Sequence, residues 1–174
     1  MIKIGEFNQL TVIKKKDFGV YLGLSMDDES GVLLPKNEVP DEIDISDSLN
    51  VFVYKDSEDR LICTTKDPLI HMYDIKKLKV VQTTKIGAFL DWGLMKDLFL
   101  PFKEQMGKVK EGNSYLVGLY VDKSERLCAT MRINKLLTND HQYQQGDSVE
   151  GVVYNVHDDL GVFVDAIISE FESE

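Results

Sequence analysis

The chain has 174 residues, of which 43% are hydrophobic and 29% are charged, so wholesale disorder is excluded. No run of ~18 apolar residues is available for a transmembrane helix, the N-terminus lacks a secretory pattern, and two cysteines do not make a disulfide framework. These features predict a cytoplasmic protein of one domain or two small ones, with no membrane partner.

The net charge of −10 disfavours nucleic acid at first, because phosphate repels a negative protein. The charge is unevenly distributed, however. Residues 1–66 have a net charge of −5, residues 67–134 of +3 and residues 135–174 of −8. Any phosphate-binding surface is therefore expected in the middle third of the chain.

An internal repeat with a period of about 66–68 residues organises the sequence. Asp17–Leu22 matches Lys85–Leu90 and Asp159–Val164, Leu33–Lys36 matches Phe99–Phe102, and Asp59–Thr64 matches Glu125–Thr130. Three blocks in one order make chance similarity a poor explanation. The repeat predicts domains at 1–66 and 67–134, followed by the truncated start of a third at 145–174.

Alternating segments rich in β-branched residues, separated by turn residues, predict five short strands in each complete copy. In the first copy they are Phe7–Ile13, Phe18–Leu24, Gly31–Leu34, Ser48–Tyr54 and Arg60–Thr65. In the second copy they are Tyr73–Thr83, Gly87–Asp91, Asp97–Leu100, Ser114–Val121 and Arg126–Arg132. Short helical segments are expected at Lys36–Glu38 and Phe102–Met106, each just after a proline. Five strands in about 65 residues favour a small closed barrel, since closure removes exposed edges.

Glycines 19, 87 and 161 lie inside strand patterns, where we expect a bulge or bend more than a ligand contact.

The order of the blocks resembles the S1 type of OB-fold, and Gly87–Gln105 is similar to the second S1 repeat of the bacterial CvfB (conserved virulence factor B, YitL-like) RNA-binding family. The resemblance implies an all-β chain of tandem S1-type five-stranded barrels. Full-length members continue with a third S1 module and a winged helix. Here the sequence stops at Glu174, so two complete barrels and a partial third are expected.

S1 and OB barrels bind single-stranded nucleic acid by stacking bases on aromatic residues of strands 2 and 3. Alternation places Tyr21 and Phe89 on the outer face of the second strand in each copy. The resemblance implies stacking positions at Phe18 and Tyr21, at Ile86 and Phe89, and at Leu160 and Phe163. It also assigns Leu34 and Leu100 to the third-strand position that often holds His in S1 modules.

Basic residues are the second part of the predicted site. Lys14, Lys15 and Lys16 are expected to form the loop between the first two strands, bordering the cleft, although a solvated turn explains them equally well. Arg60 and Arg126 each follow an aspartate by four residues, which fits either a turn salt bridge or an arginine presented to phosphate. In the second copy, an RNA path is predicted from interleaved lysines and aromatics: Lys85, Lys96, Lys103, Lys108, Lys110, Phe89, Trp92 and Phe102.

Two aromatic positions in the second copy stay open. Trp92 could stack on a base or cap the end of the barrel, and at least one of Phe99 and Phe102 is expected in the core. The predicted nucleic-acid-binding residues are Phe18, Tyr21, Lys14, Lys15, Lys16, Arg60, Lys85, Phe89, Trp92, Lys96, Phe102, Lys103 and Arg126.

Enzymatic interpretations have little support. The three histidines lack zinc-ligand spacing, and no phosphate-loop or nucleophile motif occurs. Cys63 and Cys128 occupy equivalent places in the two copies and are expected to be buried hydrophobes. We therefore expect no catalytic residue, no metal and no cofactor.

The leading hypothesis is a non-catalytic RNA-binding protein that holds single-stranded RNA with low sequence specificity, chiefly on the second copy. An alternative is an acidic scaffold that docks a basic protein partner, favoured by the net charge of −10 and the missing ring at Ile86. In a third hypothesis, the acidic segment 146–174 covers the cleft of the second copy.

Overall fold

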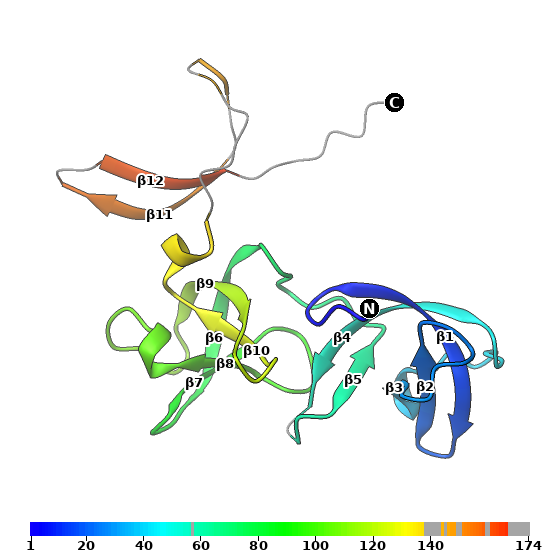
Figure 1. Cartoon of the computed structure of the whole chain (residues 1–174). Helices are drawn as coiled ribbons and strands as arrows, with labels where there is room; N and C mark the ends of the chain where they lie inside the picture. The colour runs from blue at the N-terminus through cyan, green and yellow to red at the C-terminus, as the bar shows by residue number, and fades with distance from the viewer. Residues whose placement is uncertain (57, 138–143, 145, 149–150, 159–160, 167–174) are drawn as a thin grey trace.

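The computed structural model describes residues 1–56, 58–137, 144, 146–148, 151–158 and 161–166 (Figure 1). Within these residues the strands form two closed barrels and one two-stranded sheet, which confirms the predicted all-β architecture with two five-stranded barrels. In this described part of the chain, no helix is long and apolar enough to cross a membrane.

The first barrel closes in the order β1-β2-β3-β5-β4, with β3 and β5 running parallel and the other neighbours antiparallel. Alternation fills its interior, because every second residue of each strand points inward. Its elements are β1 (Phe7–Lys16), β2 (Gly19–Gly23), β3 (Val32–Pro35), the 3₁₀ helix η1 (Lys36–Glu38), β4 (Ser48–Lys55) and β5 (Leu61–Thr64).

The second barrel repeats this plan in the order β10-β8-β7-β6-β9. Its elements are β6 (Ile75–Thr83), β7 (Gly87–Asp91), β8 (Leu98–Pro101), the 3₁₀ helix η2 (Phe102–Glu104), β9 (Ser114–Val121) and β10 (Leu127–Thr130), followed by η3 (Ile133–Lys135). In both barrels the glutamate that ends the 3₁₀ helix after the third strand anchors the last strand. Thr64 donates to Glu38, and Thr130 donates to Glu104 over 2.7 Å.

The prediction that Lys14, Lys15 and Lys16 form a loop is wrong. All three belong to β1 and pair with Tyr21, Val20 and Gly19 of β2. A β-bulge between Val12 and Lys14 adds one residue to the strand, which lets β1 continue to Lys16 and leaves only a tight turn before β2.

The same bulge occurs in the third copy. The sheet of β11 (Gly151–His157) and β12 (Gly161–Ala166) shifts register between Val153 and Asn155, as β6 does between Val80 and Gln82. The hairpin thus shares this register shift with the first two strands of each barrel. The structure describes it as a two-stranded sheet and not as a third barrel.

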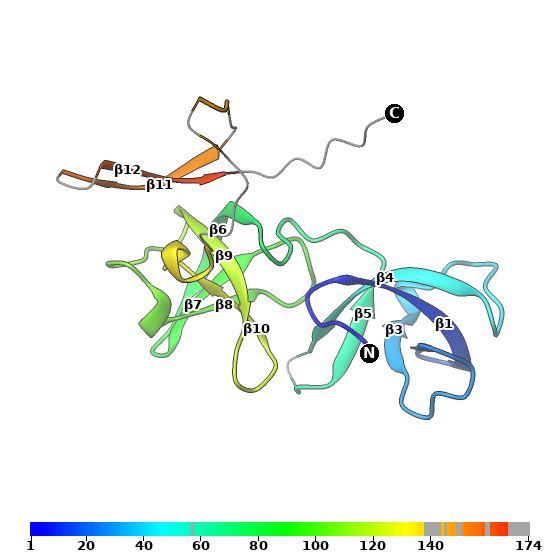
Figure 2. The same cartoon turned by 45° about the horizontal axis from the view of Figure 1, so that its top comes forward.

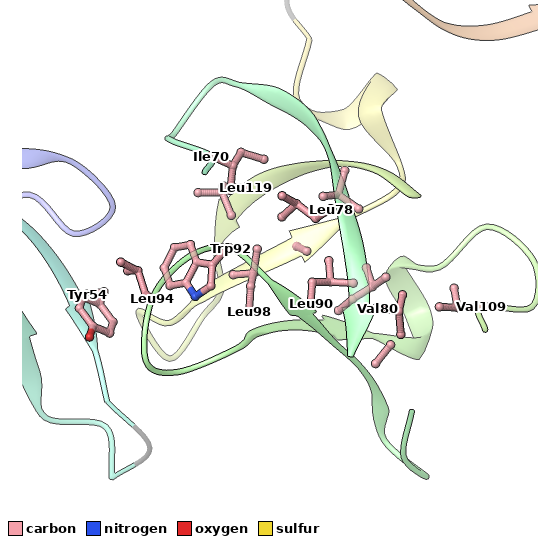
Figure 3. Close-up of a cluster of buried hydrophobic side chains, with 14 of the residues drawn as sticks. Tyr54, Ile70, Leu78, Val80, Leu90, Trp92, Leu94, Leu98, Val109 and Leu119 are labelled. Carbon is pink, nitrogen blue, oxygen red and sulfur yellow. The ribbon is translucent and has the colours of Figure 1, made fainter. Parts of the chain in front are cut away.

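A shared hydrophobic core joins the two barrels. Phe52 and Tyr54 alternate with the core residues of β4, so their side chains leave the first barrel and enter the core of the second. Figure 3 shows Tyr54 next to Leu94, with Trp92 beyond it. Trp92, in the turn after β7, meets both rings edge to face, with centroids 6.0 Å away in each case. Figure 1 and Figure 2 both show β4 and β5 beside the second barrel. We call this interface the seam.

Polar contacts surround the seam. The Lys96 ammonium donates to the backbone carbonyls of Lys55 and Asp56, at 3.2 and 2.6 Å. The Lys55 ammonium pairs with Glu125 at 3.2 Å, and Arg126 pairs with Asp59 of the first barrel. Burial lowers the pKa of Lys96, yet two carbonyl acceptors compensate for the lost water.

The residue of β9 that corresponds to Phe52 is Gly118, since Phe52 pairs with Thr64 and Gly118 pairs with Thr130. A side chain at Gly118 would collide with Leu136, which follows η3 and packs on this spot. The second barrel therefore covers this position with its own chain, whereas the first barrel covers it with its neighbour.

Gly19 and Gly87 permit the close approach of the second and third strands in each barrel. Their φ angles are 153° and 157°, and an added Cβ would meet the carbonyl oxygens of Leu34 and Leu100. Both glycines are buried, and the bulge next to them lies in β1 and β6 and not at the glycines themselves. Their structural role is therefore the close approach of two strands, where a bulge or bend was predicted.

Gly87→Ala is expected to lower the free energy of unfolding by about 2 kcal/mol or more, because strain and a backbone clash act together. Urea denaturation measures this. Gly107→Ala is the matched control, since Gly107 also has a positive φ (84°) but nothing lies within 4 Å of an added Cβ. The control should lose only about 1 kcal/mol. Equal losses would contradict the steric explanation.

Candidate nucleic-acid interface

The first barrel presents an aromatic pair on its outer face. Val20 and Leu22 point into the core, so the half-buried Tyr21 between them points outward, as predicted. Phe18 lies in the turn before β2, is 57% exposed and meets Tyr21 edge to face, with centroids 6.3 Å apart. The sequence therefore placed both side chains of this pair correctly on one surface.

Lys14 and Lys15 of β1 lie in different places, one on this outer face and the other at the end of the barrel near Asp44. Lys14 pairs with Tyr21 in the strand register, and paired residues share a face. Lys15 pairs with the inward-facing Val20 and turns to the end of the barrel, where it donates to the carbonyl of Ile43 and pairs with Asp44 at 2.9 Å. Lys15 is therefore bound within the protein, whereas Lys14 borders the aromatic pair.

Arg60 forms the turn salt bridge that the spacing allowed. Its guanidinium contacts Asp56 at 2.8 Å and Glu58 at 2.9 Å while its side chain stays 69% exposed. The backbone N–H of Arg126 donates to Asp122 as that of Arg60 does to Asp56, but the Arg126 guanidinium crosses the seam to Asp59. The two arginines have equivalent positions in the repeat but different partners.

The second barrel has a stronger aromatic pair than the sequence indicated. Phe89 of β7 and Phe99 of β8 are paired in register, and their ring centroids lie 5.2 Å apart. Ile86, at the position without a ring, is 66% exposed beside them. Phe99 thus supplies the second ring that Ile86 lacks.

The prediction that Phe99 or Phe102 lies in the core is wrong, and the third-strand position that the resemblance assigned to Leu34 and Leu100 faces inward. Leu34 and Leu100 are fully buried, so the outward residues of β3 and β8 are their neighbours Leu33 and Phe99. Neither Phe99 nor Phe102 is in the core, since Phe99 is half-buried on the outer face and Phe102 is 56% exposed. The alternation of Leu98, Phe99 and Leu100 contained the signal for this assignment.

Trp92 is a core residue of the seam. Its side chain is only 2% exposed and its indole N–H donates to the carbonyl of Lys96, so the ring has no open face on which a base could stack. Lys96 likewise belongs to the seam through its two backbone acceptors. The prediction that these two residues form an open RNA path does not fit their burial; a tight Asp-Trp-Gly turn directed the indole into the barrel junction.

Three other predicted residues lie together at one end of the second barrel. The backbone N–H of Phe102 contacts the carbonyl of Ile86 at 3.4 Å, which places η2 against the turn that holds Lys85. Lys85 and Lys103 are exposed, and neither has an acidic partner among the residues that the structure describes. Lys108 lies close by, on the wall of a cavity of about 320 Å³ that Phe102 also lines.

A second cavity, of about 200 Å³, lies where the outer face of the second barrel meets the seam. Ile86, Phe89 and Phe99 line it from the second barrel, and Tyr54 and Lys55 line it from the first. The sequence could not indicate this cavity, because its walls come from both copies.

The third copy adds little to the described site. Leu160 and the side chain of Phe163 lie outside the described residues. So do residues 149–150, 159–160 and 167–174 of the acidic segment that was expected to cover the second barrel.

The S1 domain family model matches residues 4–66 and 74–132, which contain the two barrels. These ranges make up more than half of the chain. The chain belongs to the S1 domain family. The membership agrees with the S1-type pattern of the two repeats.

Two relatives that the chain matches carry the names of the family that Gly87–Gln105 resembles. The chain is 29% identical over 162 residues to YitL of Bacillus subtilis, covering 87% of this chain and 53% of YitL. It is 29% identical over 122 residues to conserved virulence factor B of Staphylococcus aureus, covering 68% of this chain and 37% of that protein. The chain thus spans about half of the first relative and less of the second.

A solved structure shares the fold. A multidomain protein with nucleic acid binding domains from Streptococcus pneumoniae superposes with a TM-score of 0.64 at 20% sequence identity. The match covers 94% of this chain and 59% of that protein. At this identity the likeness concerns the fold alone.

The two cysteines are buried and unpaired, as expected. Burial raises the pKa of the Cys63 thiol to about 12 and that of Cys128 to about 11. Cys63 lies in the core of the first barrel, whereas Cys128 pairs with Phe99 in the second.

Both thiols are therefore expected to resist modification at pH 8 in the folded protein, because thiolate is scarce and access is poor. A colorimetric thiol reagent should give less than about a tenth of the rate seen in 6 M guanidinium, at both sites. Rapid labelling of one thiol under native conditions would show that its barrel opens locally.

Proposed function

We propose that this chain binds single-stranded RNA, without catalysis and with low sequence specificity, on the outer faces of its two barrels. The observation that carries the proposal is the repeated aromatic pair: Phe18 with Tyr21, and Phe89 with Phe99. Rings on this face are suited to stacking, and each stacked base contributes about 1–3 kcal/mol whatever its identity. The inferred cytoplasmic location agrees with two unpaired thiols.

The distribution of charge supports the same surfaces. Lys14 and Lys16 border the first aromatic pair, and Lys85 and Lys103 border the turn next to the second. None of the four has an acidic partner within the described residues. Such ammonium groups can follow an RNA backbone even on a protein whose net charge is −10.

The S1 family membership and the nucleic-acid-binding description of the Streptococcus pneumoniae protein support RNA or DNA as the ligand class. The outer faces favour single strands, because only unpaired bases expose their ring faces to aromatic side chains. Stacking on a ring tolerates any base, because every base has a flat aromatic face, so little sequence preference is expected.

Phe89→Ala is expected to weaken binding of a 12-nucleotide oligouridylate about tenfold, through loss of one stacked base. Fluorescence anisotropy at low salt measures the affinity. Tyr73→Ala is the matched control, because Tyr73 is an aromatic residue with 83% exposure that belongs to neither face. If Phe89→Ala and wild type bind with equal affinity, and circular dichroism shows that both are folded, the proposed site is wrong.

The salt dependence of RNA affinity should show how many lysines contact phosphate. Four phosphate contacts predict a slope of roughly −3 in log affinity against log salt, or about a 50-fold loss between 50 and 200 mM salt. The double variant Lys85→Gln, Lys103→Gln should reduce the slope by about 1.4, at roughly 0.7 per contact. Lys135→Gln is the control, since Lys135 pairs with Glu104 at 3.8 Å. No RNA binding at low salt would instead favour the acidic scaffold with a basic protein partner.

A further inference from the structure

We propose that the cavity at the seam binds one unpaired nucleobase and thereby joins the two stacking faces into a single RNA track. This inference rests on the proposed function, because it assigns a further subsite to the same ligand. The subsite would belong to neither barrel alone. Its walls come from β4 of the first barrel and from β7 and β8 of the second.

On the first barrel, outward side chains form an unbroken row that leads to the cavity. Tyr21 pairs with Leu33, Leu33 pairs with Ile62, and Ile62 pairs with Tyr54. Neighbours in register share a face of the sheet, so each residue continues the surface of the one before. Ile62 and Tyr54 both pack against the core of the seam. The row thus runs from the aromatic pair of the first barrel to the wall of the cavity.

On the second barrel, the row continues from the opposite wall. The rings of Tyr54 and Trp92 are perpendicular, and both line the cavity together with Phe99 and Phe89. Ile86 lines the cavity as well and remains 66% exposed beyond it. Aromatic and aliphatic side chains therefore continue from one stacking face to the other, and charged residues line the same cavity beside them.

The charges around the cavity favour a base over a phosphate. Lys55 is paired with Glu125, Lys96 is bound by two carbonyls, and Arg126 is paired with Asp59. Asp97 lines the cavity as an exposed carboxylate, and no partner for it is found in the described part of the chain. Phosphate would meet this carboxylate and no uncommitted cation. A planar, uncharged ring would instead contact Phe89, Phe99 and Tyr54.

The site depends on the docking of the two barrels. Tyr54 is held against Trp92 by ring packing, and the connecting segment is fixed because Ile70 is fully buried in the same core. The cavity is therefore preformed, so a base would enter without a large ordering cost. RNA bound across it would contact both barrels at once.

The test compares three RNAs on the full chain: a 12-nucleotide oligouridylate, a 4-nucleotide oligouridylate, and a 12-nucleotide strand whose four central nucleotides are abasic. The two 12-mers have the same phosphates, so their electrostatic contribution is matched. Anisotropy gives affinity and stoichiometry. Trp92 is the single tryptophan and lines the cavity, so its emission reports occupancy of the seam.

We expect one 12-mer per chain, about tenfold weaker binding of the abasic strand, and a change in Trp92 emission only with the intact 12-mer. Equal affinity of the two 12-mers with unchanged Trp92 emission would overturn the seam subsite while leaving RNA binding to the outer faces intact. Absence of binding by every strand at low salt would overturn the proposed function itself.

A variant pair makes the same distinction. Tyr54→Leu removes a ring from the cavity wall and should lower affinity for the intact 12-mer about fivefold, with little effect on the abasic strand. Phe7→Leu is the control, because Phe7 packs on Phe52 and His71 beside the seam but does not line the cavity. Equal losses in both variants would attribute the effect to a loosened seam and contradict a base in the cavity. The comparison of strands on wild type stands even if a variant fails to fold.

Discussion

The packing of Trp92 edge to face against Phe52 and Tyr54 determines how the rest of the molecule is arranged. A barrel of about 60 residues buries only a modest share of its surface, so it is marginal alone. Burying three aromatic side chains between two such barrels adds apolar burial that neither has by itself, beyond the gain from ring geometry. The outer faces consequently keep a fixed relation to each other, and the cavity between them has a permanent shape.

The strands could be predicted because the alternation of apolar and polar residues indicates them, and the internal repeat indicates the same strands independently. The inward positions of β2 and β7, and hence the outward Tyr21 and Phe89, followed directly from that alternation. The seam was not predictable in the same way. Phe52 and Tyr54 occupy outward positions of β4, which in a single barrel would face solvent. Their burial depends on docking, a property of the pair and not of either repeat.

Positive charge in the sequence was likewise a poor guide to available charge. Lys15 is bound by Ile43 and Asp44, and Lys96 is bound by two carbonyls of the first barrel. Part of the positive charge of residues 67–134 is therefore used to hold the barrels together. A count of residues cannot separate these cations from Lys14 or Lys85, because the distinction depends on partners distant in sequence.

The two barrels contribute different surfaces to the seam. The first barrel contributes β4 and β5, whereas the second contributes the turn at Trp92, so the contact is heterologous and does not close on itself. Such head-to-tail contacts can in principle be propagated by further repeats of the same unit. Leu136, seated on Gly118, occupies the place where the next barrel would insert its own tryptophan turn. At this position of the second barrel the place that Phe52 holds in the first is therefore already filled.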